Sequence, residues 1–176
     1  MQETILRTQR LLRIPSQETV VDYIVGTAFN GLEIPGDYLE IKSIAVDDVE
    51  LTMTARDTVL REGKYVGRSR WYYRNGGVFY IAPRPKIGST IRLTYLANFA
   101  DLSDDTDRNF LTDSAFDVLI NGAMKLACVH FMDPRQGNFE EEYVKAVQDL
   151  NNMALRDELN DAAISPGWHW GDHDCD

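Results

Sequence analysis

The chain has 176 residues and a formal net charge of −10, with 44% hydrophobic and 10% aromatic residues. This length suits one domain, or one domain carrying an insertion, and the composition excludes a disordered chain. No apolar run approaches the roughly 18 residues of a membrane span, and residues 1–13 lack the apolar core of a signal peptide. We therefore expect a protein that is soluble and intracellular when made.

Charge is divided unevenly along the chain. The first 100 residues carry 13 basic and 11 acidic side chains, a net of +2, whereas the remainder carries 5 basic and 17 acidic ones, a net of −12. The basic excess is concentrated between Thr52 and Leu96. Ends of opposite charge favour head-to-tail ordering in a stacked assembly. The alternative is a solvated charge distribution with no partner.

Residues 4–12 predict a short amphipathic helix, which Pro15 ends. Arg7, Arg10 and Arg13 recur every three residues and form one charged ridge. Such a ridge can meet a phosphate backbone or an acidic protein surface, but three arginines more often form a solvated face.

From Thr19 the apolar residues alternate with a period of two, which predicts antiparallel strands. Asn30-Gly31 and Asn75-Gly76-Gly77 are the clearest hairpin turns, and Asp47-Asp48 is a weaker one. A short helix is expected over residues 54–62, with Thr54 as its cap and Gly63 at its end. The predicted strands are Val20–Val25, Leu32–Ile34, Tyr38–Val46, Val49–Met53, Trp71–Arg74, Val78–Ile81 and Ser89–Ala97.

Basic and aromatic residues are interleaved in and around the predicted strand Trp71–Arg74. Lys64, Arg68, Arg70 and Arg74 are candidate partner-binding residues in this β segment. Aromatic rings among basic residues can stack nucleobases, so a single-stranded nucleic-acid surface is one interpretation of residues 71–73. Aromatic pairing across a sheet as part of the core is the favoured one.

The loop Asp101–Asp107 is acidic and superficially resembles a calcium-binding loop. The central glycine of such a loop is missing, and Thr112 replaces the glutamate expected at its twelfth position. We predict no metal here, and a polar loop that leads into the helices.

Residues 112–159 predict a helical hairpin. After a break at Asp133–Gly137, a second helix is expected with Asn138 as its cap and Glu141 three residues later. So short a connection makes the helices antiparallel, and Gly122 with Ala123 permits their close approach. The buried stripe predicted for the first helix comprises Phe116, Leu119, Ile120, Ala123, Ala127, Cys128 and Phe131, and that of the second comprises Tyr143, Val147, Leu150 and Ala154.

The end of the chain, residues 165–176, has a composition of its own. Trp168, His169, Trp170 and His173 are candidate residues of a docking arm, because tryptophan is strongly enriched among interface anchors. A disordered tail and a metal site using His169, His173 and Cys175 are the alternatives. We predict the docking arm, with no metal and no cofactor, and we expect Cys128 and Cys175 to be free thiols.

The predicted fold class is α+β: an antiparallel helical bundle carrying an inserted antiparallel β-sheet domain, with an extended C-terminal arm. We expect an N-terminal helix of the bundle over residues 1–14 and the β insertion over residues 19–98. The helical hairpin is expected over residues 108–160, and the arm over residues 161–176.

The order of elements resembles the head-to-tail adaptor (connector) proteins of tailed bacteriophages. The resemblance covers about Leu11 to Asp157 and leaves out the aromatic end. The segments that carry it are Ile14-Pro15, LEIPGDYL (Leu32–Leu39), EIKSI (Glu40–Ile44), FYIAPR (Phe79–Arg84), TYLA (Thr94–Ala97), NFLT (Asn109–Thr112) and the helix that includes Phe139–Leu150.

This resemblance implies a structural virion protein at the head–tail interface, made in the host cytoplasm, with no enzymatic activity and no membrane association. It implies a ring, usually of twelve copies, beneath the portal protein. Such a ring extends the channel through which packaged double-stranded DNA passes without sequence-specific binding, and it presents a docking surface for a tail or nozzle protein. C-terminal segments of such adaptors reach into the portal, where Trp168 and Trp170 would be the anchors.

Two other functions are considered from the residues themselves. A phage cell-wall hydrolase would need a pair of carboxylates such as Glu33, Asp37 or Glu40, but their predicted places do not pair them. A nucleic-acid-binding module would use residues 68–74, although a basic overall charge is absent.

Overall fold

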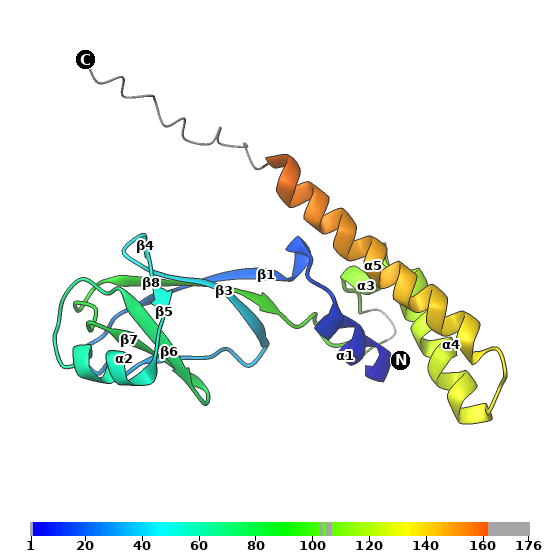
Figure 1. The fold of residues 1–176 in the computed structure, drawn as a ribbon, viewed down its shortest axis with the longest axis horizontal. Helices are drawn as coiled ribbons and strands as arrows, with labels where there is room; N and C mark the ends of the chain where they lie inside the picture. Colours follow the sequence, from blue (N-terminus) through cyan, green and yellow to red (C-terminus); the bar gives the residue numbers. More distant parts are fainter. Residues whose placement is uncertain (1, 103, 105–106, 162–176) are drawn as a thin grey trace, which may run out of the picture.

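The computed structural model describes residues 2–102, 104 and 107–161. It has two parts that lie at opposite ends of an elongated molecule (Figure 1). The β sandwich comprises strands β1 to β8 and the short helix α2. The helical region comprises α1, α3, α4, α5 and the 3-10 turn η1, so among the described residues it contains segments from before the first strand and from after the last one.

The strands form two four-stranded sheets, with orders β1-β8-β3-β4 and β2-β7-β6-β5. All pairs within the first sheet are antiparallel, whereas β5 and β6 in the second are parallel, so the prediction of purely antiparallel pairing is wrong for that pair. The strands are β1 Glu18–Ile24, β2 Leu32–Glu33, β3 Tyr38–Val46, β4 Val49–Glu50, β5 Thr52–Met53, β6 Trp71–Asn75, β7 Val78–Ala82 and β8 Thr90–Ala97.

The sandwich core lies between the two sheets and contains twelve buried residues. Ile44 and Leu93 come from the first sheet, and Tyr72 and Phe79 come from the second. The rings of Tyr72 and Phe79 meet edge to face, with 5.9 Å between their centroids. Alternate side chains thus point inward from both sheets, which explains the period of two in the sequence.

Two of the three hairpins predicted from turn residues are confirmed. Asp47 and Asp48 both adopt left-handed backbone angles, with φ of 48° and 62°, and they join β3 to β4. Gly76, with φ of 58°, lies in the turn that joins β6 to β7. The Asn30-Gly31 hairpin is wrong, because the strands on its two sides belong to different sheets: β1 pairs with β8 and β2 pairs with β7.

Helix α2, Arg56–Glu62, covers part of the outer face of the second sheet. Its buried Val59 packs with Tyr73 and Ala82. The helix follows Ala55 and has no side-chain cap, so the predicted cap at Thr54 is wrong, whereas Gly63 ends the helix as predicted.

The helices after the sandwich form a hairpin with a short preceding turn of helix. Asn109 caps α3, Phe110–Ser114, by accepting hydrogen bonds from the backbone N–H groups of Leu111 and Thr112. Ala115 interrupts the helix, and α4, Phe116–Phe131, follows. Helix α5, Gln136–Asp161, runs back along α4 (Figure 1). Because α5 begins at Gln136, the predicted cap at Asn138 is wrong.

Helix α1, Gln2–Leu11, packs against this hairpin, and η1, Pro15–Gln17, leads into β1. A Cβ atom added at Gly122 would overlap the Thr4 side chain and would lie 3.1 Å from the ring of Tyr143. The hydroxyl groups of Thr8 and Tyr143 are hydrogen-bonded at 3.0 Å. The predicted role of Gly122 in close helix approach is therefore confirmed.

The predicted fold class is wrong. The protein is α+β, but it is not an antiparallel helical bundle with an inserted antiparallel sheet, because strands dominate its N-terminal part and close a core of their own. The helical region has a separate core of eleven buried residues, of which only Ile5 comes from α1. Of the predicted arm, Asp161 is the last residue of α5 and residues 162–176 lie outside the described residues, and the division into four domains stays a prediction.

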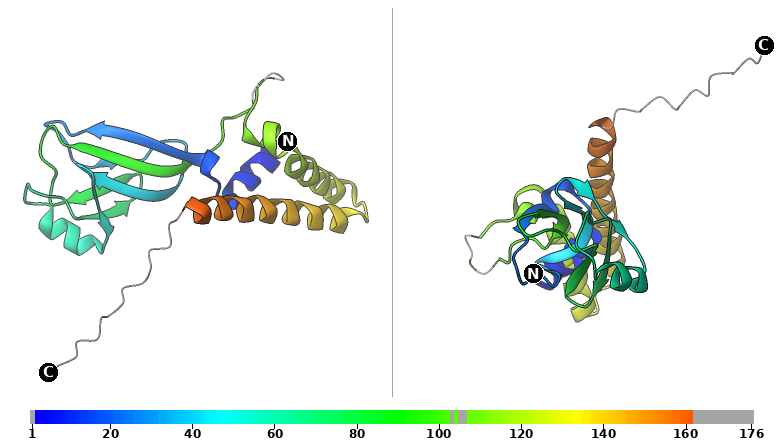
Figure 2. Two further views of the ribbon diagram at one scale, coloured as in Figure 1. Left: turned by 90° about the horizontal axis from the view of Figure 1, so that it is seen from above. Right: turned by 90° about the vertical axis from the view of Figure 1, so that its left-hand side faces the viewer.

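Polar contacts join the two parts where α5 passes the beginning of the sandwich (Figure 2). Arg13 forms an ion pair with Glu40 at 2.7 Å, and Lys42 on β3 contacts Glu158 on α5 at 3.0 Å. Asn151 of α5 accepts a hydrogen bond from the backbone N–H of Arg13. Its amide also donates to the carbonyl oxygen of Leu11. The end of α1 is thereby tied to the middle of α5.

Candidate functional site

Helix α4 has apolar side chains on two opposite sides. One side, which includes Val118 and Leu119, is buried in the helical core. The other side comprises residues spaced by three or four positions, so they align along one face of the helix, which we call the α4 outer face. Its members are Phe116, Ile120, Ala123, Met124, Ala127 and Phe131.

The large side chains of the α4 outer face are exposed. Phe116, Ile120, Met124 and Phe131 are 56%, 44%, 37% and 78% exposed. The prediction of a single buried stripe is therefore wrong for Phe116, Ile120 and Phe131, and confirmed for Leu119 and Cys128. A helix with apolar side chains on two opposite sides needs a second partner besides its own core.

Helix α5 has a weaker apolar face of the same kind. Val144, Leu155 and Leu159 are exposed, and their spacing turns them away from the buried line of Tyr143, Val147 and Ala154 by roughly a third of a helical turn. We call these three residues the α5 outer face. The hairpin thus has apolar side chains outside its core on both helices.

The four basic residues predicted to bind a partner are all exposed, but they lie against different neighbours. Arg74, near the end of β6, lies over the ring of Tyr38, 5.1 Å from its centroid. Arg70 precedes the start of the same strand, about 13 Å away by the rise of an extended chain. Lys64 and Arg68 line two separate cavities. The structure therefore does not gather the four residues into one cluster.

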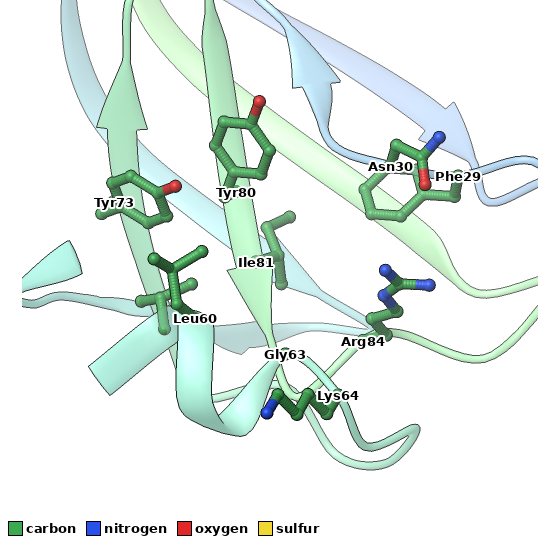
Figure 3. Close-up of a pocket in the computed structure, with 10 residues that line it drawn as sticks. Phe29, Asn30, Leu60, Gly63, Lys64, Tyr73, Tyr80, Ile81 and Arg84 are labelled. Atoms are coloured by element: carbon green, nitrogen blue, oxygen red, sulfur yellow. The ribbon is translucent and has the colours of Figure 1, made fainter. Parts of the chain in front are cut away.

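Lys64 lines the cavity between α2 and the outer face of the second sheet, with a volume of about 370 Å³. Figure 3 shows Tyr73, Tyr80 and Leu60 along one side of this cavity and Phe29, Asn30 and Arg84 along the other. The aromatic residues of β6 are largely core: Tyr72 and Tyr73 are buried, in line with the favoured interpretation.

The carboxylates considered for a hydrolase have separate surroundings. Asp37 accepts a hydrogen bond from the hydroxyl of Tyr95 at 3.0 Å, and Glu40 is paired with Arg13. Glu33 lies on β2, in the other sheet. Burial, with the Asp37 contact as a second cause, raises the pKa of Tyr95 to about 12. These contacts have structural explanations and do not assemble a pair of carboxylates around a cleft.

The remaining predicted sites lie at the end of the chain. Trp168, His169, Trp170 and His173 fall outside the described residues, as does Cys175. Cys128 is a buried free thiol. Among residues 2–102, 104 and 107–161, no group of three or more histidine, cysteine or carboxylate side chains is placed to hold a metal ion.

Sequence reasoning missed the cavity beside α2. Two of its lining residues, Phe29 and Arg84, are 55 positions apart and come together only through the packing of the sheets. One local signal was present: Val59 and Leu60 are adjacent apolar residues in a seven-residue helix, whose single buried side accommodates Val59 and leaves Leu60 exposed.

The described surfaces are suited to contact with other macromolecules: an apolar helix face at one end of the molecule, and exposed basic residues with a lined cavity at the other. They define an assembly protein. The chain matches the SU10 adaptor protein family over residues 1–167 and belongs to this family of phage head-to-tail adaptors. No curated protein matches it.

Family membership makes the protein a structural component of a phage virion with an adaptor role, and it implies contacts with portal and tail proteins in general. The resemblance found in the sequence is thereby confirmed. Among the described helices, none combines the length and apolarity required to cross a membrane.

Proposed function

We propose that this adaptor forms a ring of twelve copies beneath the portal, extends the DNA channel and provides the docking surface for a tail or nozzle protein. The observation that carries the proposal is the α4 outer face. A continuous row of exposed apolar residues along a 16-residue helix is unfavourable in water and becomes favourable when a neighbour covers it.

The occupant that we propose is the α5 outer face of the next copy. In a closed ring of more than two copies, each interface joins two different surfaces, so the α4 outer face must meet another face of its neighbour. Val144, Leu155 and Leu159 offer apolar side chains on the other helix of the same hairpin. Hairpins placed side by side would therefore alternate α4 and α5 around the ring.

The charge of the chain fits the passage of DNA through such a ring. Residues from Asp101 onward carry a net charge of −12, and this part contains the helical hairpin. Acidic residues around a channel repel phosphates, so double-stranded DNA slides past without sequence-specific binding. An electrostatic map of the assembled ring with a continuous positive channel would contradict this role.

The C-terminal arm and the sandwich have different partners in this proposal. Trp168, His169, Trp170 and His173 form the arm that docks on the portal. The basic residues of the sandwich, Lys64, Arg68, Arg70 and Arg74, face the tail or nozzle protein. In the sandwich, Arg68 and Arg70 are exposed on both sides of the buried Ser69, whose hydroxyl donates to the carbonyl oxygen of Pro83 at 2.8 Å, so they project from a fixed loop.

The α4 outer face can be tested by the substitution Ile120→Glu. A charge in the middle of an apolar interface has to be desolvated, so we expect assembly on portal rings to weaken by about tenfold or more. The mass of the purified protein, alone and mixed with portal rings, measures this by light scattering. Circular dichroism should remain unchanged, because Ile120 lies outside the helical core.

Val20→Glu is the matched control, since Val20 is an exposed apolar residue on β1 of the sandwich. This variant should assemble like the unaltered protein. Normal assembly of Ile120→Glu would remove the α4 outer face from the ring. Removal of residues 165–176 should weaken portal binding without loss of helix content, and unchanged binding would contradict the docking role of Trp168 and Trp170.

A further inference from the structure

Two cations beside the α2 cavity are not neutralised by any described carboxylate. Lys64 and Arg84 both line the cavity and are exposed, and neither forms an ion pair with another described residue. Some other cations of the sandwich do form ion pairs: Arg92 pairs with Asp22 and Asp48, and Lys42 pairs with Glu18. The charge at the cavity is therefore available for a negatively charged group from outside.

The segments that carry these cations are fixed to each other. The backbone N–H of Arg84 donates to the carbonyl oxygen of Tyr65 at 2.8 Å, and its carbonyl oxygen accepts from the N–H of Gly67 at 3.0 Å. Lys64 immediately precedes the loop that makes these bonds. A site whose backbone is already in place loses less entropy when it binds a ligand.

Two of the three aromatic residues of the cavity, Tyr73 and Tyr80, cover one ring face of each other. The rings of Tyr73 and Tyr80 stack on each other, with centroids 5.1 Å apart and planes 17° apart, and Tyr73 is buried beneath α2 with Val59. A nucleobase needs an open ring face on which to stack. An apolar side chain needs only an apolar wall, so the cavity favours a protein ligand over a nucleic acid.

The size of the cavity agrees with this assignment. A volume of about 370 Å³ is sufficient for one large side chain and lies at the lower end of the range of ligand pockets. A second cavity, also of about 370 Å³, shares Phe29 and Arg84 with the first and continues past Val66 and Ile87. Both of these apolar side chains are exposed. The two cavities are adjacent because they share Phe29 and Arg84 as lining residues, and we call them together the groove.

We propose that this groove receives an extended, acidic segment of the tail or nozzle protein. One aromatic or branched aliphatic side chain of the segment occupies the α2 cavity, and a neighbouring carboxylate contacts Lys64 and Arg84. Charge complementarity supports an acidic partner, because nine basic residues and two acidic ones lie between Thr52 and Leu96. The identity of the partner rests on the function proposed above, whereas the chemistry of its segment rests on the cavity.

The probes are three fluorescein-labelled hexapeptides, Glu-Asp-X-Asp-Glu-Gly, in which X is Trp, Phe or Leu. Fluorescence anisotropy should show saturable binding of at least one of them to the full chain. Replacement of X by Ala, and the double variant Lys64→Glu/Arg84→Glu, should each weaken that binding by about tenfold or more. Arg56→Glu/Arg61→Glu is the matched control, because it changes the net charge by the same amount. Both side chains are exposed on α2 and neither lines the cavity, so this replacement should change affinity by less than about twofold.

Three results would overturn the proposal. The first is the absence of saturable binding by all three peptides. The second is an equal loss of affinity in Arg56→Glu/Arg61→Glu and Lys64→Glu/Arg84→Glu, which would mean attraction by overall charge alone. The third concerns two competitors of the labelled peptide: the unlabelled peptide and an oligothymidine of equal net charge. Displacement by the oligothymidine at the lower concentration would indicate a nucleic-acid site.

A chain truncated after Ile164 tests whether residues 165–176 of this protein occupy the groove themselves. This segment is acidic and contains two tryptophans. Peptide binding at least tenfold tighter to the truncated chain would identify that end as the natural occupant and would exclude a partner segment. The portal assay is independent of these measurements. Loss of portal binding with intact peptide binding would refute the proposed function and leave the cavity chemistry in place.

Discussion

The sandwich and the helical region have cores of similar size, but they differ in how completely the chain covers the apolar side chains of each part. In the sandwich, twelve buried residues lie between two sheets that face each other, so the inward side of each strand has a partner within the chain. In the helical region, eleven buried residues use only one side of α4, and the apolar residues of its outer face remain exposed. The sandwich is complete as a single copy, whereas the hairpin has the composition of a helix pair that another protein covers.

Removal of one large apolar side chain from each part, buried in the sandwich and exposed on the hairpin, tests this comparison most directly. Leu93 is fully buried on β8, which pairs with β1 on one side and β3 on the other. Leu93→Ala should lower the free energy of unfolding by about 3 kcal/mol. Phe116→Ala, on the α4 outer face, should change it by less than about 0.5 kcal/mol in the monomer, because Phe116 already contacts water.

Urea unfolding of the monomer at low protein concentration measures both values. Assembly of the ring should instead be weakened more by Phe116→Ala than by Leu93→Ala, since a neighbouring copy then covers the α4 outer face. A large loss of monomer stability in Phe116→Ala would show that the hairpin depends on that side chain without a neighbour, and the comparison would fail.

The contact between α1 and the hairpin gives the next largest effect. Gly122→Ala places a Cβ atom against Thr4 and the ring of Tyr143, so α1 has to shift, and we expect a loss of about 1–3 kcal/mol. Gly137→Ala is the matched control: Gly137 lies in α5, and nothing lies within 4 Å of an added Cβ atom. Because alanine favours helix over glycine, this control should be stabilised, by up to about 1 kcal/mol.

Thermal unfolding followed by circular dichroism distinguishes these two variants. Equal melting temperatures for Gly122→Ala and Gly137→Ala would mean that α1 packs loosely on the hairpin. The close approach at Gly122 would then contribute little to the helical core.

The sequence predicted the strands better than their pairing. Tyr38–Val46 was predicted with the bounds that it has, because alternation records which side chains face inward. Alternation does not record partners. Asp22 on β1 pairs with Arg92, 70 positions later, and β5 lies parallel to β6 after a connection that contains α2. These choices depend on which faces of two sheets meet, which no local pattern contains.

In α4, the spacing of apolar residues correctly predicted a helix, but the interpretation of these residues as one buried stripe was wrong. The pattern in α4 contains two faces, and the sequence alone does not state which one the chain covers. Gly122 and its contact with Thr4 decide this, because α1 can approach only the side that lacks a side chain. The α2 cavity was not predictable for a related reason, since Phe29 and Arg84 meet only in the folded sandwich.

The smallest expected change in stability concerns the ion pairs of Lys42, which lie where the sandwich meets α5. Lys42 contacts Glu18 and Glu158 and is 40% exposed, so solvent screens both pairs. The hydrogen bond to Glu18, with that to Glu158, raises the pKa of Lys42 above its ordinary 10.5. A raised pKa means that the pairs stabilise the native state fully below pH 10.5, and that this contribution is lost as the pH rises through the native pKa.

Lys42→Met should therefore cost only about 0.2–1 kcal/mol at pH 7, and the difference from the unaltered protein should disappear at strongly alkaline pH. Urea midpoints at the two pH values measure this, and Arg61→Met is the control, because Arg61 pairs with Glu62 inside α2 and does not bridge the parts. Spin labels at Glu50→Cys and Gln148→Cys, in a chain whose native cysteines are replaced (Cys128→Ala, Cys175→Ser), report the position of α5 relative to the sandwich. We expect a broader distance distribution in Lys42→Met, because this side chain joins β3 directly to α5. An unchanged distribution would mean that Asn151 and the Arg13–Glu40 pair hold the two parts together without it.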